Sequence, residues 1–246
     1  MDTIVDRRST TVAQGRRRAP GRDRAVTLAG ALLAATGIGI VLSTITNEAL
    51  YPAQRHYSTF ADTISSLSGT EPPDSYTVQP NRLIFIVTMA VAGVLVLAAA
   101  ALLRHLARRR LVIALAVFGS GLIGIAVFPG DVATWHPIFA MTCFVGGSIA
   151  AVLSGTLLDR PLRAFAVTLG SVALAATVLG LDFFADLGPQ TAIGIGGVER
   201  WIAYPVLLWM VLFGAALMTG GTHSWAGPQL DAHQSRVPVP KAPSHD

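Results

Sequence analysis

Charged residues, cysteine and aromatic residues are scarce in this chain of 246 residues. Only 13% of the residues are charged and 7% are aromatic, whereas 52% are hydrophobic. A composition so poor in charge leaves little sequence for a separate water-soluble domain. The single cysteine, Cys143, excludes an intramolecular disulfide and a multi-cysteine metal site.

Six long apolar stretches without an internal charge make up most of the chain. Each has about 18 to 22 residues, the length that a helix rising about 1.5 Å per residue needs to cross an apolar core of about 30 Å. The sequence therefore predicts an all-α polytopic membrane protein with one domain. The predicted transmembrane helices are residues 26–45, 83–103, 111–128, 137–158, 164–181 and 201–218.

Polar segments rich in Arg, Pro, Ser or His flank this membrane domain, which we assign to residues 25–219. Residues 1–24 and 220–246 show no helical period, and we expect them to be disordered tails. The first apolar stretch could instead belong to a signal peptide. It is longer than a normal signal-peptide core and no small-x-small cleavage site follows it, so we expect a permanent helix.

The basic residues divide unevenly between the two predicted membrane sides. Fifteen of the 18 lie in the tails or in the connections after the second and fourth helices, and only Arg55, Arg82 and Arg200 lie opposite. The positive-inside rule then predicts that both termini are cytoplasmic, and we expect a multi-pass protein of the inner or plasma membrane. Because these arginines follow the topology, they indicate no nucleic-acid partner.

Small residues recur at fourfold spacing in two of the predicted helices. Such rows let helix backbones approach closely, and we expect them to mark packing faces within one bundle rather than a dimer interface. The first row belongs to residues 26–45 and the second to residues 137–158: Ala31, Ala35 and Gly39, and Gly147, Ala151 and Gly155.

Residues suited to proton transfer or metal binding gather on the predicted outer side. Two histidines, His56 and His136, lie there with eight of the 14 acidic residues. These acids fall in or beside the three outer connections: Glu48, Asp62, Glu71, Asp74, Asp131, Asp182, Asp186 and Glu199.

The first outer loop, residues 46–80, is predicted to contain a short amphipathic helix. Thr59 and Asp62 fit a capping box, and the polar Asp62, Ser65 and Ser66 point away from the apolar face. Such a helix could be a lid over the bundle or an anchor in the membrane interface. Its apolar face is formed by three residues: Phe60, Ile64 and Leu67.

The second outer loop is so short that Asp131 and His136 must both lie near the membrane boundary. A histidine beside a carboxylate is a minimum for general base chemistry or metal binding. The alternative is a structural hydrogen bond that closes the loop. We take Asp131 and His136 as candidate catalytic residues, and His136, Asp131 and Glu199 as candidate metal ligands.

The last outer connection supplies Asp182 and Asp186, which share a helical face if the fifth helix continues, and then Glu199 and Arg200. Ionisable residues at membrane depth are candidates for function. The alternative is that Glu199 or Asp182 forms an ion pair with Arg200 or Arg82 that fixes the helix ends. The candidate ligand-binding residues are Asp62, Ser65, Ser66, Asp182, Glu199 and Arg200.

Several short motifs lie in a fixed order at the predicted helix ends: Ile64–Gly69, Asn81, Gly121–Gly124, Phe128–Asp131, His136, Gly197–Arg200, Tyr204–Pro205 and Trp209. Together they resemble the bacterial and archaeal membrane family called domain of unknown function 998, over about residues 25–219. The resemblance implies a six-helix membrane domain of unestablished activity. It highlights Ser65, Asp131, His136, Glu199 and Arg200 without assigning chemistry to them.

Three functions are compatible with these patterns. The leading hypothesis is a non-catalytic outer pocket that binds a lipid headgroup, a small solute or a partner protein. The second is a membrane hydrolase or transferase, possibly metal-dependent, acting on lipid substrates. Alkaline ceramidase-type hydrolases also gather His, Asp and Ser at a membrane face, but this chain has only two outer histidines and none is predicted within a helix. A small permease is disfavoured, because the non-hydrophobic residues at the helix centres are only Ser, Thr and Gly.

Overall fold

The computed structural model describes residues 20–70, 75–181 and 192–220, and the described residues contain helices and no strand. Six helices are long and apolar enough to cross a membrane. The prediction of an all-α, multi-pass membrane protein is therefore confirmed. The predicted tails lie largely outside the described residues, although the first helix already begins at Pro20. The helices are α1 (Pro20–Ala49), α2 (Asn81–Leu103), α3 (Arg109–Val127), α4 (Trp135–Ser154), α5 (Leu162–Leu179) and α7 (Gly194–Thr219).

Local sequence explains where several of these helices begin and end. A helix satisfies all its backbone polar groups internally, which is why apolar segments of this length become helices in a membrane. Pro129 follows the end of α3 and limits its continuation, and Pro137 lies in the first turn of α4, where a missing N–H is tolerated. Gly220 ends α7 in the left-handed conformation, with φ 74°, and donates to the carbonyl of Ala216.

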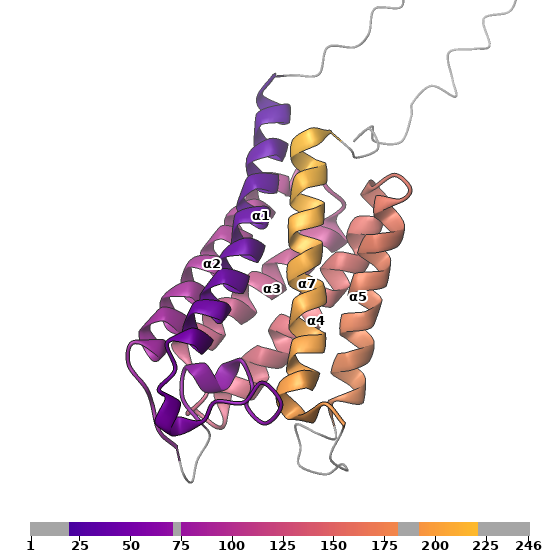
Figure 1. The fold of residues 1–246 in the computed structure, drawn as a ribbon. Helices are drawn as coiled ribbons and strands as arrows, with labels where there is room; N and C mark the ends of the chain where they lie inside the picture. Colours follow the sequence, from indigo (N-terminus) through magenta and orange to yellow (C-terminus); the bar gives the residue numbers. More distant parts are fainter. Residues whose placement is uncertain (1–19, 71–74, 182–191, 221–246) are drawn as a thin grey trace, which may run out of the picture.

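The helices form a closed ring in which each contacts the next. The order is α1, α2, α3, α4, α5, α7 and back to α1 (Figure 1). α1 and α7, far apart in sequence, therefore lie side by side. The short connections between α2 and α3 and between α4 and α5 lie at the end of the bundle near the start of α1 and the end of α7. We call the opposite end, which carries the first loop and the start of α7, the loop end.

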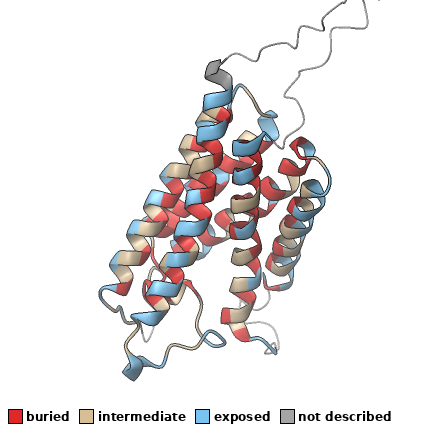
Figure 2. Ribbon diagram, turned by 45° about the horizontal axis from the view of Figure 1, so that its top comes forward, coloured by how far each residue is buried: buried red, intermediate tan, exposed pale blue. Residues whose placement is uncertain are grey.

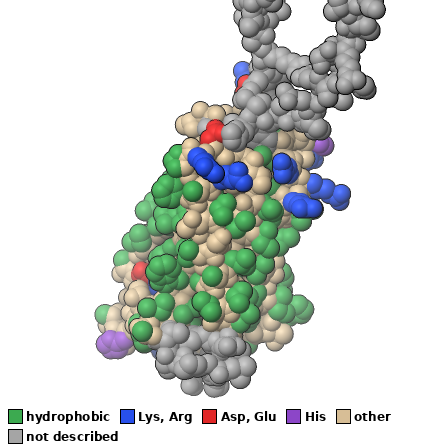
Figure 3. All heavy atoms as spheres, turned by 90° about the vertical axis from the view of Figure 1, so that its right-hand side faces the viewer, with side chains coloured by type: hydrophobic (Ala, Val, Ile, Leu, Met, Phe, Trp, Pro, Cys, Tyr) green, Lys and Arg blue, Asp and Glu red, His purple; other side chains and the backbone are tan. Residues whose placement is uncertain are grey.

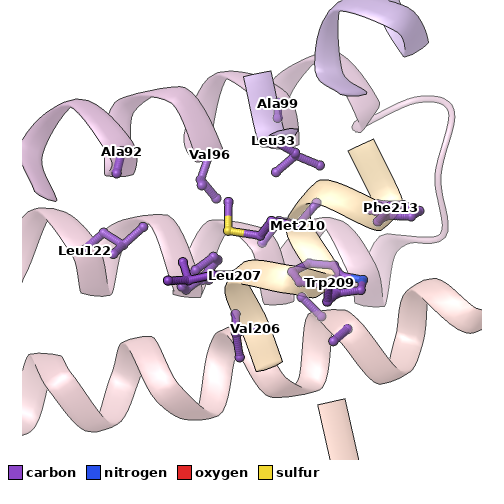
Figure 4. Close-up of a cluster of buried hydrophobic side chains, with 14 of the residues drawn as sticks. Leu33, Ala92, Val96, Ala99, Leu122, Val206, Leu207, Trp209, Met210 and Phe213 are labelled. Carbon is purple, nitrogen blue, oxygen red and sulfur yellow. The ribbon is translucent and has the colours of Figure 1, made fainter. Parts of the chain in front are cut away.

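The bundle interior is apolar and close-packed around α7. Trp209, Met210 and Phe213 of α7 are fully buried, and Met210 extends toward Val96 of α2 (Figure 4). The rings of Trp209 and Phe213 stack at a centroid distance of 5.7 Å. The indole Nε1 of Trp209 donates to Ser154 Oγ at 2.8 Å, which satisfies its one polar atom.

The outward faces of the helices are also apolar, but they are exposed. Figure 2 shows exposed residues along the outer surfaces and buried residues toward the interior. Leu42 of α1, Leu83 of α2 and Leu179 of α5 are 58%, 59% and 81% exposed. Large apolar side chains exposed over the whole flank are expected where a protein faces lipid rather than water.

One of the two rows of small residues forms a packing face and the other does not. Ala151 of the second row is fully buried against Gly170 of α5, and a Cβ at Gly147 would lie 2.8 Å from Val206 of α7. In the first row, by contrast, Ala35 is exposed and Gly39 has no atom within 4 Å of where its Cβ would be. The prediction that the first row forms a packing face was wrong. Spacing alone does not fix the rotation of a helix, and the rotation of α1 turns this row away from α7.

The close approach between α1 and α7 uses different glycines. A Cβ on Gly30 would lie 2.5 Å from the carbonyl oxygen of Gly214, and a Cβ on Gly214 would lie 2.5 Å from that of Gly30. A Cβ on Gly37 would similarly lie 2.8 Å from the Leu207 carbonyl. The backbones of α1 and α7 can therefore touch at Gly30 and Gly214 only because neither residue has a side chain.

The described arginines follow the asymmetry noted in the sequence. Figure 3 shows blue side chains gathered at the end that carries the start of α1 and the end of α7, above a flank dominated by hydrophobic side chains. The connections Arg104–Arg110 and Asp159–Arg163 lie at that end, and Arg55, Arg82 and Arg200 lie at the loop end. The cytoplasmic location of the termini stays a prediction from the positive-inside rule.

Candidate functional site

The first loop is folded over the loop end of the bundle, but not as the predicted amphipathic helix. Between the end of α1 and residue 70, and again over residues 75–80, the only helical turns are two three-residue 3₁₀ helices, Ala53–Arg55 and Ser65–Leu67. Ile64 and Leu67 are buried as expected, whereas Phe60 is 50% exposed. A helix over this segment would need internal hydrogen bonds, but its backbone groups bond to α7 instead, and those contacts decide its path.

The predicted capping box of Thr59 and Asp62 is replaced by a turn that begins one residue earlier and still ends at Asp62. Ser58, rather than Thr59, starts the turn: its hydroxyl accepts from the N–H groups of Phe60 and Ala61 at 3.3 and 3.4 Å. Asp62 closes the motif by accepting from the N–H of Ser58 at 2.7 Å. One carboxylate oxygen of Asp62 is thus engaged in shaping the loop.

Arg200 of α7 ties this loop to the bundle. Its guanidinium donates to the carbonyls of Thr59 and Asp62 at 3.2 and 3.1 Å. It also forms an ion pair with Glu48 at 2.6 Å and donates to the hydroxyl of Tyr57 at 2.7 Å. The predicted ion pair between Arg200 and Glu199 or Asp182 is therefore wrong for Glu199, and Asp182 lies outside the described residues.

Tyr57 connects Arg200 to the next part of the loop. Its hydroxyl accepts from Arg200 and donates to the carbonyl of Thr63 at 2.9 Å. Burial raises the pKa of Tyr57 well above its usual value. The phenol is therefore protonated at neutral pH and remains able to donate to Thr63.

Glu199, the residue before Arg200, hydrogen bonds to the loop from inside the bundle. Its side chain is buried, with the residue only 4% exposed. One carboxylate oxygen accepts from the backbone N–H of Ile64, and the other accepts from the hydroxyl of Ser65 at 2.8 Å. Neither ion pair found among the described residues involves Glu199.

A second set of contacts ties the loop to the turn between α3 and α4. The N–H of Gly130 donates to Ser68 Oγ at 2.9 Å, and Arg82 donates to the Ser68 carbonyl at 3.2 Å. Arg82 also pairs with Asp131 at 2.8 Å. Asp131 therefore belongs to this structural contact rather than to a pair with His136.

His136 lies in the first turn of α4, which corrects the expectation that no outer histidine belongs to a helix. It is buried, with an exposure of 4%. Its Nδ1 lies 2.8 Å from the carbonyl oxygen of Phe128, so one ring nitrogen closes the short turn as the structural interpretation predicted. Its Nε2 is buried and has no partner among the described residues.

His136 and Glu199 line one cavity, which we call the polar chamber. Its volume is about 110 Å³, well above the roughly 10–15 Å³ needed to hold a water molecule. The loop forms one wall, α4 a second and the first turns of α7 a third. The lining residues are Thr63, Ser65, His136, Pro137, Ala140, Met141, Phe144, Ile195 and Glu199.

A second cavity, the apolar chamber, lies deeper in the bundle and shares a wall with the first. Its volume is about 70 Å³, and side chains from α1, α2, α3, α4 and α7 line it. Ser65 and Glu199 supply its polar groups, Cys143 adds a thiol, and its other lining residues are hydrophobic. The residues that line both chambers are Ser65, Ala140, Phe144 and Glu199.

The structure thus brings together three of the predicted site residues and separates the others. Ser65, His136 and Glu199 share the polar chamber. Ser66 hydrogen bonds to Thr63 at 2.8 Å, and Asp131 and Arg200 are held in ion pairs. In the described part of the chain, no three His, Cys, Asp or Glu side chains are grouped to hold a metal ion, so the three-ligand metal site is not carried forward.

Sequence reasoning missed the residues that build the apolar chamber. Ala140 and Cys143 look like ordinary residues of a membrane helix, and nothing in their spacing distinguishes the chamber wall from a packed core. The partner of Arg200 was easier to anticipate from the sequence, because Glu48 is one of the outer acidic residues. Which acid pairs with which arginine depends on the path of the loop.

Comparison with known proteins gives one match. A family model described as "Protein of unknown function (DUF998)" matches residues 49–216. No curated protein and no solved structure matches the chain. The matched region contains the first loop, the second outer turn and the start of α7, and thus all the residues that line the polar chamber.

Proposed function

The chain belongs to the DUF998 family of proteins of unknown function, and from that premise we propose that it binds a lipid-like amphiphile in its two adjoining chambers. The polar headgroup would occupy the polar chamber, against His136 and Glu199. The apolar part would enter the apolar chamber through the wall that the two cavities share. A membrane supplies such molecules at high local concentration.

The chemistry of the two chambers supports an amphiphile over a wholly polar solute. Ligand sites are typically apolar cavities with a few placed polar groups. Here the polar groups gather at one end, and the remaining depth is lined by residues such as Phe118, Leu122 and Val206. An apolar cavity of this kind holds water poorly and favours apolar groups.

The unpartnered Nε2 of His136 is the observation that carries this proposal. A buried polar atom without a partner costs about 1–3 kcal/mol, and native proteins contain few of them. This one belongs to a residue that lines a cavity shared with Glu199 and Ser65. A ligand that hydrogen bonds to Nε2 would remove that cost.

Filling the shared wall tests the proposal. Ala140 lines both chambers, so Ala140→Phe would obstruct them. Ala175→Phe makes the same change at an exposed position of α5 and serves as the control. Binding of a set of dodecyl amphiphiles to the full chain in neutral-lipid nanodiscs would be measured by native mass spectrometry.

Retention of at least one dodecyl compound by the wild type and the Ala175→Phe variant, with a loss of about tenfold in Ala140→Phe, supports the proposal. Equal retention by all three proteins, or retention by none, overturns it. Thermal unfolding of each protein would confirm that Ala140→Phe is folded, and Ala203→Leu offers a milder obstruction of the apolar chamber if it is not.

A second candidate function, a membrane hydrolase acting on lipid esters, is favoured by one contact. The hydroxyl of Ser65 donates to Glu199 at 2.8 Å, and His136 lines the same chamber. A hydroxyl beside a base is the usual arrangement for nucleophilic catalysis. Hydrolysis of a dodecanoyl ester by the wild type, lost in Ser65→Ala, would establish this activity, and absence of turnover would remove it.

The permease hypothesis is not carried forward. The hydroxyl groups buried within the helices are used internally: those of Thr36, Ser148 and Thr177 donate to carbonyls of their own helices at 2.7, 2.7 and 2.8 Å. A transport path would instead need polar groups that face a continuous cavity.

A further inference from the structure

We infer that the headgroup bound in the polar chamber is a primary ammonium group, so that the ligand is a long-chain amine. This inference rests on the proposed amphiphile site and adds the chemical class of the ligand. It follows from the hydrogen-bonding capacity and the charge of the residues that line the chamber.

The side chains of the chamber offer acceptors. The Nδ1 of His136 faces the Phe128 carbonyl, which can only accept, so Nδ1 carries a proton, and in the Nδ1–H tautomer Nε2 presents a lone pair. The two oxygens of Glu199 each receive one hydrogen bond from the protein and can accept more. A ligand at this position must therefore supply donors.

The side-chain donors near these acceptors are already used. The hydroxyl of Ser65 donates to Glu199. The hydroxyls of Thr63 and Ser66 bond to each other at 2.8 Å. A primary ammonium group has three N–H donors, enough to contact both Nε2 of His136 and the carboxylate of Glu199.

The charge of the chamber points the same way. Neither lysine nor arginine is among its lining residues, and the guanidinium of Arg200 is held by Glu48 and by loop carbonyls. Burial without a paired cation disfavours the ionised form of a carboxyl group, and a cationic ligand would favour that form. A phosphate headgroup would add a second negative charge beside Glu199 and is disfavoured.

Four probes with the same chain and different heads separate these properties. Dodecylamine carries charge and donors, dodecyltrimethylammonium carries charge without donors, dodecanol carries a donor without charge, and dodecyl phosphate carries the opposite charge. Their binding to the full chain would be compared in nanodiscs of neutral lipid. The signal remaining in the Ala140→Phe variant would be subtracted as binding outside the chambers.

Dodecylamine is expected to bind about tenfold or more tightly than each of the other three. In Glu199→Gln its affinity should fall about tenfold and approach that of dodecanol. Asp23→Asn removes one negative charge from an exposed position in the first turn of α1 and should leave the affinity unchanged. This control accounts for any general effect of net charge.

Equal or tighter binding of dodecanol, dodecyltrimethylammonium or dodecyl phosphate would overturn the ammonium inference and leave the amphiphile site standing. Failure of all four probes to show binding that depends on Ala140 would overturn both. The comparison among probes uses the wild-type chain, so it stays decisive if Glu199→Gln does not fold.

Discussion

Glu199 and Arg200 are neighbours in α7, yet they hold the first loop through opposite kinds of group. Glu199 accepts hydrogen bonds from Ile64 and Ser65, whereas Arg200 donates to the carbonyl of Asp62. The first turns of one helix thus fix both the outer and the inner part of the loop. The loop in turn forms a wall of the polar chamber.

Replacing Arg200 by lysine should destabilise the protein. Lysine cannot reproduce the planar contacts to Glu48, Tyr57 and the loop carbonyls, and a hydrogen bond to a charged group contributes about 1.5–3 kcal/mol. We expect a lower midpoint of thermal unfolding in detergent. Arg163→Lys, at an exposed position, is the control. Identical midpoints for the two variants would contradict the role given to Arg200.

The contact between α1 and α7 gives a matched pair of glycine substitutions. Gly30→Ala would place a Cβ 2.5 Å from the Gly214 carbonyl and should cost about 1–3 kcal/mol through overpacking. Gly39→Ala meets no atom within 4 Å and should be neutral or mildly stabilising, because alanine is the better helix former. Thermal unfolding of the two variants, measured side by side, distinguishes these outcomes. A Gly30→Ala variant at least as stable as Gly39→Ala would refute the close contact.

Tyr57 should make stability sensitive to alkaline pH. Its pKa in the folded protein is raised by burial, so the unfolded chain loses this proton first. The stabilisation is complete below the ordinary tyrosine pKa of about 10 and is lost as pH rises toward the raised value. Unfolding measured between neutral and alkaline pH should show a steeper loss for the wild type than for Tyr57→Phe. Parallel curves would count against the buried phenol.

The predicted orientation can be tested with introduced cysteines. In a Cys143→Ser background, Thr134→Cys lies in the exposed turn before α4, and Arg109→Cys lies at the opposite end. A membrane-impermeant maleimide should label Thr134→Cys in intact cells and Arg109→Cys only after permeabilisation. The reverse pattern would show that the termini are outside.

Much of the fold followed from the sequence, because a membrane demands long apolar helices whose number and approximate limits can be read from hydropathy. The rotation of each helix about its axis could not be predicted from hydropathy, and the row containing Gly39 was therefore placed on the wrong face. The local pattern of residues 59–67 favoured a helix, but hydrogen bonds donated to Glu199 and donated by Arg200, both distant in sequence, gave the loop another path.

The candidate site was predictable as a set of residue types and only partly as a set of contacts. Ser65, His136 and Glu199 were all identified as polar residues near the membrane boundary, and they share a chamber. Asp131 was grouped with them because it is close in sequence to His136. Its partner is instead Arg82, at the start of α2, a pairing that requires knowing how α2 and the α3–α4 turn meet.

Photoaffinity labelling tests the proposed binding site most directly. A dodecylamine carrying a diazirine near the end of its chain would be irradiated with the full-length protein in nanodiscs, and the modified residues would be mapped by mass spectrometry. The account predicts modification of residues that line the apolar chamber, such as Phe118, Leu122 and Cys143, and its suppression by unlabelled dodecylamine. Modification confined to exposed, lipid-facing residues such as Leu42 and Leu179, without competition, would contradict it.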